Sequence, residues 1–312
     1  MRAFVFPGQG AQAIGMGKGL ADAYPAARAV FDAVDEALGE KLSALIWEGS
    51  IDDLTLTRNA QPALMATSLA AMAALAAEGV EVTVASYVAG HSLGEYSALC
   101  AAGALSLADT ARLLRLRGEA MQAAVPVGIG AMAALLGMDF AAAREVAAEA
   151  ASGGSGGEVC EAANDNDPGQ VVVSGHRAAV ERAVEIAKAR GAKRALLLPV
   201  SAPFHSSLMA PAAAVMAQAL DNVQVLQPLV PLVANVSAKA VTDPIQIKAL
   251  LVRQVTGSVR WRESVLWMET AGVTEFWEIG AGRALSGMIK RIAGGAVTRA
   301  IGTPEDVAAA KA

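Results

Sequence analysis

The stretch GHSLGE, residues 90–95, lies between the apolar run VTVASYVA (82–89) and a helical stretch, YSALCAAGAL (96–105). A serine in the pattern G-x-S-x-G is typical of a nucleophile elbow when it joins a strand to a helix. The chain must turn sharply there, and any side chain at Gly90 or Gly94 would crowd the turn. We therefore expect Ser92 to be a nucleophile; the alternative is a serine that only caps the helix.

The same alternation of strand and helix continues along the chain. Apolar runs of strand length include RAFVF (2–6), VPLVANV (230–236) and TEFWEIG (274–280). Helical stretches cover about 59–78, 107–124 and 244–255. Strands that alternate with helices predict an α/β fold with a mostly parallel sheet.

Residues 128–198 have a different order. Strand-like runs at 130–137, 159–164, 170–175 and 192–198 are separated by helical runs at 139–151 and 177–191. The order β-α-β-β-α-β is the split βαβ pattern. We predict that 127–198 is a unit inserted into a larger one formed by 1–126 and 199–312. The Asx-rich NDNDPG (164–169) is interpreted as the turn between the two middle strands.

The bulk composition limits the classes of partner. Of the 312 residues, 54% are hydrophobic and 18% charged, which predicts a packed globular protein. The formal net charge of -5 argues against nucleic acid as the main partner. The most apolar run, SLAAMAALAA (68–77), is about half as long as a membrane span. We expect a cytoplasmic protein that does not enter a membrane.

A serine nucleophile needs a base, and the chain has only three histidines. His91 adjoins Ser92, but neighbours on a sharp turn point in different directions, and His176 fits a surface turn or helix cap. His205 follows a strand, in a loop that Pro199 and Pro203 make rigid, where an α/β site gathers its residues. We expect His205 to be the base, the alternative being a capping or packing histidine.

The acid of a complete triad is missing. No carboxylate stands out on a strand-end loop between Ser92 and His205, since Asp165 and Asp167 fall in the predicted turn. The sequence therefore favours a Ser–His dyad whose histidine is oriented by a neutral acceptor. The loop PGQGAQ (7–12) can place a backbone N–H beside that of Leu93 as an oxyanion hole. A phosphate-binding loop is the rival interpretation, although the Walker ending is absent.

One arginine falls on a buried stripe. In the helical run 107–124, Arg117 shares the i, i+3, i+4 face with Thr110, Leu113, Leu114 and Met121. A buried guanidinium needs an anion or several acceptors. It therefore either forms an internal salt bridge or serves as a fixed cation for a substrate carboxylate.

Six segments, in the same order along nearly the whole chain, resemble malonyl-CoA:acyl carrier protein transacylases. They are FPGQGAQ (6–12), NAQPALMATSLA (59–70), GHSLGEYSAL (90–99), RLRGEAMQ (115–122), SAPFHSSLM (201–209) and LLVRQVTGSVRW (250–261). The resemblance implies an α/β-hydrolase-like subdomain with a ferredoxin-like subdomain inserted. The chain departs from the family pattern at Ala11, where serine is common in the family, and at Ser258, where proline is common.

The resemblance also implies roles for individual residues. Ser92 matches the nucleophile and His205 the base, while Gln9 and Leu93 match the backbone donors of the oxyanion hole. Gln254 matches the position whose main-chain carbonyl orients the histidine. The implied substrate-binding residues are Arg117, which would pair with the malonyl carboxylate, Gln61, Met121, Asn164 and Phe204, the last being typical of malonyl-type enzymes.

The implied reaction needs no metal or bound cofactor. Its partners would be malonyl-CoA and an acidic holo acyl carrier protein. The enzyme itself would be a monomer. Candidate docking cations are Lys188, Arg190, Lys193, Arg194, Lys290 and Arg291, each of which is otherwise an ordinary surface charge. Two alternatives stay open: a serine esterase or thioesterase with the same elbow, and a non-catalytic module that binds a carrier protein.

Overall fold

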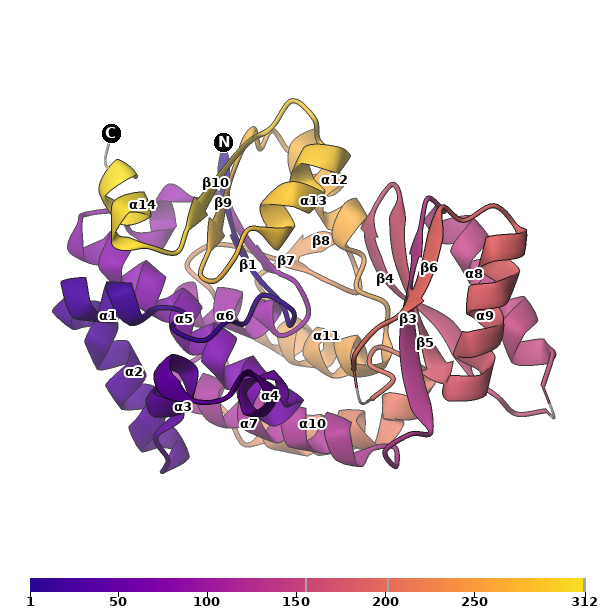
Figure 1. The fold of residues 1–312 in the computed structure, drawn as a ribbon. Helices are drawn as coiled ribbons and strands as arrows, with labels where there is room; N and C mark the ends of the chain where they lie inside the picture. The colour runs from indigo at the N-terminus through magenta and orange to yellow at the C-terminus, as the bar shows by residue number, and fades with distance from the viewer. Residues whose placement is uncertain (155, 201, 311–312) are drawn as a thin grey trace.

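Two separate β-sheets organise the molecule (Figure 1). The computed structural model describes residues 1–154, 156–200 and 202–310. The larger sheet has the order β10-β9-β1-β2-β7-β8, and its neighbours run parallel except for β8, which is antiparallel to β7. The predicted α/β class is confirmed. The strands of this sheet are β1 (Arg2–Phe6), β2 (Tyr87–Gly90), β7 (Leu232–Ala234), β8 (Lys239–Val241), β9 (Glu275–Ile279) and β10 (Val297–Ile301).

Helices cover both faces of the larger sheet. In β1, Phe4 and Phe6 pack into one hydrophobic core, Ala3 and Val5 pack into the other, and all four are fully buried. This explains why residues 3–6, AFVF, are all apolar and do not alternate with polar residues. The helices are α1 (Lys18–Ala23), α2 (Pro25–Leu38), α3 (Leu42–Glu48), α4 (Ile51–Thr55), α5 (Thr57–Ala77), α6 (Gly94–Ala101), α7 (Leu107–Ala123), α10 (Ala210–Asp221), α11 (Pro244–Thr256), α12 (Trp261–Thr270), α13 (Ala284–Ile292) and α14 (Pro304–Ala309), with 3₁₀ turns at Val82–Val84 and Ser207–Met209.

Two sequence interpretations of this larger unit are corrected. The predicted strand 82–89 begins only at Tyr87, because β1 offers partners from Ala3 onward and Ala3 pairs with Tyr87. The apolar run 68–77 belongs to α5, which has 21 residues and a hydropathy of 1.4 in its most apolar window. By length and composition α5 would therefore suffice to cross a membrane. However, 83% of that window is buried inside the protein, so α5 is a core helix.

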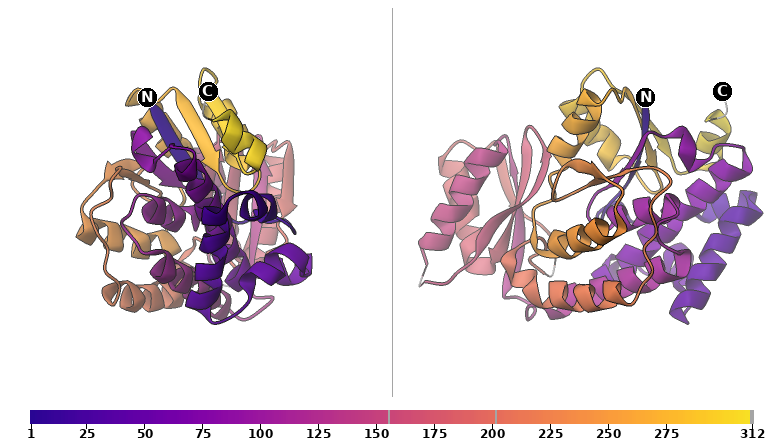
Figure 2. Two further views of the ribbon diagram at one scale, coloured as in Figure 1. Left: turned by 90° about the vertical axis from the view of Figure 1, so that its left-hand side faces the viewer. Right: turned by 180° about the vertical axis from the view of Figure 1, so that it is seen from behind.

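The smaller sheet is antiparallel, with the order β4-β5-β3-β6. Helices α8 (Phe140–Ser152) and α9 (Arg177–Ala189) pack on one of its faces around a second hydrophobic core. Figure 1 and the right view of Figure 2 place this unit at one end of the molecule, beside the larger sheet. Its chain order is β3 (Gly130–Leu136), α8, β4 (Cys160–Asp167), β5 (Gln170–His176), α9 and β6 (Arg194–Leu197), which is the predicted β-α-β-β-α-β pattern.

The predicted turn NDNDPG is wrong except at its end. Strand β4 continues to Asp167, which leaves Pro168 and Gly169 as the tight connection to β5. Asp165 and Asp167 are buried and form ion pairs with Arg262 and Arg291 of the larger unit. These pairs compensate charges that a buried strand could not otherwise tolerate.

The two units join along β4. Asp165 N–H donates to the carbonyl of Val259, and Val259 N–H donates to that of Ala163, at 2.9 and 2.8 Å. Ser258 Oγ donates to the Ala162 carbonyl at 2.6 Å. The segment between α11 and α12 therefore extends the small sheet and holds it beside the carboxyl ends of β1 and β2, the edge at which open α/β sheets bind ligands.

Candidate active site

Ser92 lies on a strained turn between β2 and α6. Its φ is 52°, in the left-handed region that non-glycine residues rarely adopt. A Cβ on Gly90 would meet the carbonyl carbon of Gly94 at 1.9 Å, and one on Gly94 would meet the Phe6 oxygen at 2.2 Å. Both glycines are therefore required by close backbone approach, and the turn has the geometry of a nucleophile elbow.

The His205 ring lies within hydrogen-bond distance of that serine. Ser92 Oγ lies 2.7 Å from His205 Nε2, and His205 Nδ1 lies 2.9 Å from the main-chain oxygen of Gln254. Because a carbonyl can only accept, Nδ1 carries the hydrogen and Nε2 presents its lone pair to the serine hydroxyl. A neutral acceptor thus orients the imidazole, as the absence of a suitable acid predicts.

The surroundings of His205 keep it neutral. The residue is buried, and its φ of 56° places the ring at the tip of a turn that Ser206 braces by donating to the Pro203 carbonyl. Burial, followed by the positive charge of Arg117, lowers the pKa of His205 to about 3. The imidazole is therefore available as a base throughout the neutral range.

Arg117 is fully buried beside the serine and has only neutral partners. Its Nη1 donates to Gln61 Oε1 and its Nη2 to Gln254 Oε1, each at 2.8 Å, and Nη2 also lies 3.1 Å from Ser92 Oγ. Within the described residues no carboxylate pairs with Arg117, and its Nε has no hydrogen-bond partner. Burial accordingly lowers the pKa of Arg117. Within the described residues Arg117 therefore forms no internal salt bridge, and its guanidinium is a cation without a directly paired anion within reach of an anion bound at Ser92.

A cavity of about 390 Å³ collects these groups between the two sheets. It is lined by nine of the ten predicted site residues, namely Gln9, Gln61, Ser92, Leu93, Arg117, Met121, Asn164, Phe204 and His205. The tenth, Gln254, is buried behind them. Residues that are far apart in the sequence therefore share one hollow.

Two backbone donors in this cavity have no protein acceptor. Among the described residues, the N–H groups of Gln9 and Leu93 take part in no backbone or side-chain hydrogen bond. The Gln9 side chain is fixed separately, because its Oε1 accepts from Thr57 Oγ1 at 2.9 Å, and Gln61 Nε2 donates to the same hydroxyl at 3.1 Å. The Gln9 side chain thus holds the first loop against α5, while the backbone N–H of Gln9 stays available to a ligand, as an oxyanion hole requires.

The other two histidines have structural partners. His91 Nε2 lies 2.8 Å from Asn166 Oδ1, and burial lowers the His91 pKa. His176 Nδ1 accepts from the Val159 N–H at 2.8 Å, at the start of α9. Among the described residues, neither of these two rings hydrogen-bonds to the Ser92 hydroxyl, in agreement with the choice of His205.

Two residues that hold the turn were missed from the sequence. Asn235, just after β7, accepts from the Ser92 N–H at 2.8 Å and donates to the Gly90 carbonyl at 2.6 Å. Glu95, fully buried in the first turn of α6, accepts from Gln254 Nε2 at 2.8 Å. A carboxylate within the apolar run that follows the elbow was the available signal for Glu95, whereas nothing local distinguished Asn235.

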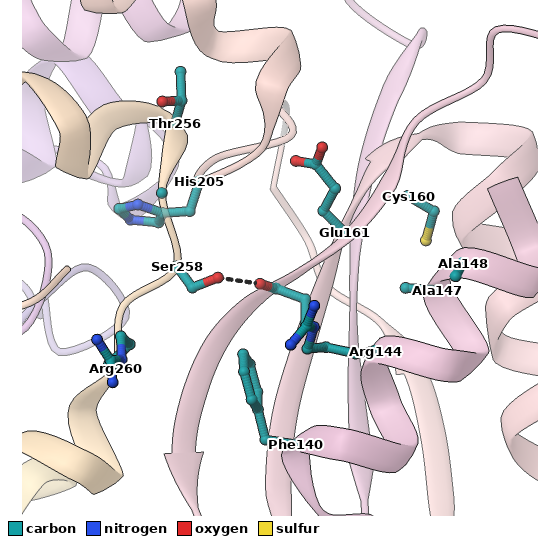
Figure 3. Close-up of a pocket in the computed structure, with 12 residues that line it drawn as sticks. Phe140, Arg144, Ala147, Ala148, Cys160, Glu161, His205, Thr256, Ser258 and Arg260 are labelled. Carbon is teal, nitrogen blue, oxygen red and sulfur yellow. Dashed lines mark hydrogen bonds between the residues drawn. The ribbon is translucent and has the colours of Figure 1, made fainter. Parts of the chain in front are cut away.

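A second hollow of about 440 Å³ lies on the other side of His205 (Figure 3). Phe140 and Arg144 of α8, Glu161 of β4, and Ser258 and Arg260 surround it, with His205 at its edge. Ser92 and Arg117 do not line it. Ser92 and Arg117 therefore line the first cavity and not this one.

Known proteins resemble this chain over nearly all of its length. A family model described as the acyl transferase domain matches residues 3–286. The malonyl CoA-acyl carrier protein transacylase of Bacillus subtilis (strain 168) is 48% identical over 305 residues, covering 98% of this chain and 94% of the relative. The crystal structure of an acyl-carrier-protein-S-malonyltransferase from Bartonella henselae is 55% identical with a TM-score of 0.96, covering 99% of this chain and 98% of the other. A structure of a type II PKS acyl-carrier protein in complex with its malonyl-transacylase matches with 41% identity and a TM-score of 0.95, covering 99% and 98%.

Proposed function

This chain belongs to the malonyl-CoA:acyl carrier protein transacylase family, and from that premise we propose that it carries a malonyl group as an ester on Ser92. The protein is an acyltransferase that moves malonyl from malonyl-CoA to the phosphopantetheine thiol of a holo acyl carrier protein. The observation that carries the proposed site is the Arg117 guanidinium, which has no carboxylate partner among the described residues and lies 3.1 Å from Ser92 Oγ.

The first half-reaction forms the ester. Nε2 of His205 takes the Ser92 proton as the serine oxygen attacks the thioester carbonyl carbon. Negative charge on the carbonyl oxygen is held by the N–H groups of Gln9 and Leu93, and losing one such donor raises a barrier by about 3 kcal/mol. The C–S bond then breaks, and the CoA sulfur leaves with the proton from His205. The products are free CoA and malonyl-Ser92.

The second half-reaction runs the same steps with a different thiol. His205 takes the proton of the phosphopantetheine thiol, whose sulfur attacks the ester carbonyl. The Ser92–acyl bond breaks, and the serine oxygen regains its proton from His205. The reaction is a ping-pong double displacement, and every proton that His205 takes it also returns.

Arg117 supplies the selectivity for malonyl. The free carboxylate of the substrate would pair with the guanidinium, whereas an acetyl group would leave the buried cation without its anion at a loss of a few kcal/mol. Gln61 and Gln254 hold the guanidinium in place through its Nη1 and Nη2 atoms. Met121, Asn164 and Phe204 line the same cavity and limit its size.

A hydrolase with the same elbow is disfavoured by the surroundings of His205. A Ser–His–acid hydrolase needs a carboxylate on Nδ1, whereas the acceptor at that atom is the Gln254 carbonyl. The buried carboxylate nearest in sequence to the nucleophile, Glu95, bonds to the Gln254 side chain instead. Transfer to a thiol is therefore the better supported chemistry.

Carrier-protein docking is proposed at the cations that remain free. Lys193, Arg194 and Lys290 are exposed and form no ion pair within the described residues. By contrast, Lys188, Arg190 and Arg291 already pair with carboxylates of this chain. A hollow of about 340 Å³ at Lys193 and Arg291 shares Gln170 with the catalytic cavity, so an acidic partner bound there would lie next to that cavity.

Four broader expectations remain proposals. The inserted unit is taken as 127–198 within 1–126 and 199–312, which the separate hydrophobic cores of the two sheets support. A cytoplasmic location without membrane contact is supported by the burial of α5. The net charge of -5 supports the absence of a nucleic-acid partner. A monomer that uses no metal or cofactor is retained from the family resemblance.

Intact-mass measurement tests the function directly. The enzyme is incubated with malonyl-CoA, and holo acyl carrier protein is added afterwards. We expect one malonyl group on wild-type protein, none on Ser92→Ala, and transfer to the carrier on addition. Rapid release of malonate without carrier would favour a hydrolase, and an unlabelled wild-type enzyme would favour the non-catalytic module.

A further inference from the structure

The buried carboxyl of Glu95 lies three residues after the nucleophile, in the first turn of α6. Its side chain is fully buried, and its Oε2 accepts two hydrogen bonds. Gln254 Nε2 donates at 2.8 Å and the Asn235 N–H at 3.1 Å. The reaction steps above assign Glu95 no role, yet both of its partners contact the reacting residues.

Asn235 and Gln254 connect Glu95 to the whole site. Asn235 accepts from the Ser92 N–H at 2.8 Å, and Gln254 Nε2 also donates to the Ser92 carbonyl at 2.9 Å. The other end of the Gln254 amide, Oε1, accepts from Arg117 Nη2 at 2.8 Å. The Gln254 main chain accepts from His205. One carboxylate therefore braces the residue that contacts nucleophile, base and cation.

Glu95 fixes the orientation of the Gln254 amide together with the Ser92 carbonyl and Arg117. An ionised carboxylate has no donor, so the NH₂ of Gln254 must face it and the carbonyl oxygen must face Arg117. The reversed amide would turn its NH₂ toward a guanidinium that also only donates. A hydrogen bond to an ionised acceptor is stronger than one to a neutral acceptor, so the carboxylate holds the amide more firmly than a neutral group would.

We propose that Glu95 is a positioning residue for malonyl recognition: its carboxylate fixes the Gln254 amide, and through it holds the Arg117 guanidinium beside Ser92. This inference rests on the proposed function, because it concerns the same transfer. It adds a residue that the substrate does not touch.

Burial of Glu95 makes this control depend on pH. Burial raises the pKa of Glu95 to about 7, while its hydrogen bonds and the charge of Arg117 oppose the rise. Tyr96 on the same helix stays neutral, because burial raises its pKa to about 12, and His205 stays neutral because its pKa is lowered to about 3.

Apart from Arg117 of α7, the described parts of the elements packed against α6 bring no charged group into contact with Glu95. Arg2 of β1 pairs with Glu275, and Arg58 of α5 is exposed to solvent. Tyr87 of β2 packs edge-on against Trp267. The Glu95 carboxyl is therefore the group in this network that changes charge near neutral pH, being ionised above about pH 7 and protonated below it.

Glu95→Gln imitates the protonated carboxyl, since it keeps one acceptor oxygen and removes the charge. The assay compares acylation of Ser92 by malonyl-CoA and by acetyl-CoA, as the ratio of their kcat/KM values, from pH 5.5 to 8.5. Acetyl-CoA carries no carboxylate for Arg117, so the ratio isolates recognition from the chemistry of the ester. The matched control is Glu119→Gln, an exposed glutamate two residues from Arg117 on α7.

Wild-type selectivity should rise with pH to a plateau, with a midpoint near 7. Glu95→Gln should match wild type at low pH and fall about 5- to 10-fold below it above pH 8, the difference between a charged and a neutral hydrogen bond. Glu119→Gln should follow wild type throughout. A merely structural role would lower both substrates equally at every pH and would overturn the proposal.

If Glu95→Gln fails to fold, the test still stands, because the pH dependence of wild-type selectivity can be measured alone. A wild-type selectivity that does not change with pH overturns the inference. The proposed function fails separately, through absence of malonyl on wild-type Ser92. If the enzyme is malonylated normally but its selectivity changes neither with pH nor in Glu95→Gln, only the proposed role of Glu95 is refuted.

Discussion

Ser92 Oγ and His205 Nε2 lie 2.7 Å apart although 113 residues separate them in the chain. The serine is presented by a turn that leaves β2, and the histidine by a loop that returns from the small antiparallel sheet. Both residues have positive φ values, 52° and 56°. Two locally strained backbones are thus held against each other by the packing of both units, and strain of this kind persists only where surrounding structure over-determines it.

Replacing Arg117 with alanine should remove the preference for malonyl over acetyl groups. The carboxylate would lose its charge-assisted pair, so we expect the ratio of kcat/KM values to fall roughly 100-fold. Acylation kinetics with the two CoA esters measure this. Arg112→Ala is the control, because Arg112 is exposed on the same helix and pairs only weakly with Asp109. An unchanged ratio in Arg117→Ala would refute the carboxylate-binding role.

His205 should make the folded protein less stable in acid. Its folded pKa, about 3, lies below its ordinary value of 6.5, so the unfolded chain binds the proton first. The contribution of the neutral imidazole to the free energy of unfolding is fully present above pH 6.5. It is lost as the pH falls toward 3, at up to about 1.4 kcal/mol per pH unit. Urea unfolding of wild type and His205→Ala at pH 7, 6, 5 and 4 should show their difference shrinking with acid. A difference that stays constant would contradict the buried neutral imidazole.

A methyl group at Gly94 should disrupt the turn that carries the nucleophile. The added Cβ would lie 2.2 Å from the Phe6 carbonyl oxygen in β1, so backbone must move. We expect Gly94→Ala to destabilise the fold by more than about 4 kcal/mol, or to prevent soluble expression. Thermal unfolding measures the change. Gly295→Ala is the control, because a Cβ there meets nothing within 4 Å, and equal melting temperatures for both variants would disprove the constraint.

Reversing the charge of Lys193 and Arg194 should weaken use of the carrier protein. An acidic partner would lose two free cations, so the KM for holo carrier should rise several-fold and become less sensitive to salt. Malonylation of Ser92 by malonyl-CoA should not change, since both residues lie outside the catalytic cavity. Lys188→Glu is the comparison, because Lys188 already pairs with Glu185. Equal effects of the two changes would argue against a docking site at Lys193 and Arg194.

Much of the site was predictable because its signals are local. The elbow follows from glycines on either side of Ser92, and the burial of Arg117 follows from helical spacing within one turn or two. Pro199 and Pro203 marked the loop of His205. The neutral acceptor on the imidazole was predicted from the lack of a well-placed acid, and the resemblance identified its position as Gln254.

Other features had no local signal. Polar residues in NDND are typical of a turn, yet Asp165 and Asp167 continue a buried strand because Arg262 and Arg291 neutralise them from the larger unit. The helix predicted at about 59–78 lies close to the observed α5, Thr57–Ala77, but its apolar part was underestimated: polar residues such as Thr57 and Gln61 in its first half are buried, which their polarity does not indicate.

The amino-acid sequence alone determined the order of strands and helices, the sharp turn at Ser92 and the inward face of Arg117, since each depends on backbone preferences and spacing over a few residues. Only the tertiary structure decided which groups meet. The fold gives Arg117 two neutral acceptors, Gln61 and Gln254, which lie 56 and 137 residues away in the sequence. It also joins Glu95 to Gln254 across 159 residues. Such contacts depend on how whole elements pack, and no short stretch of chain encodes the distance between them.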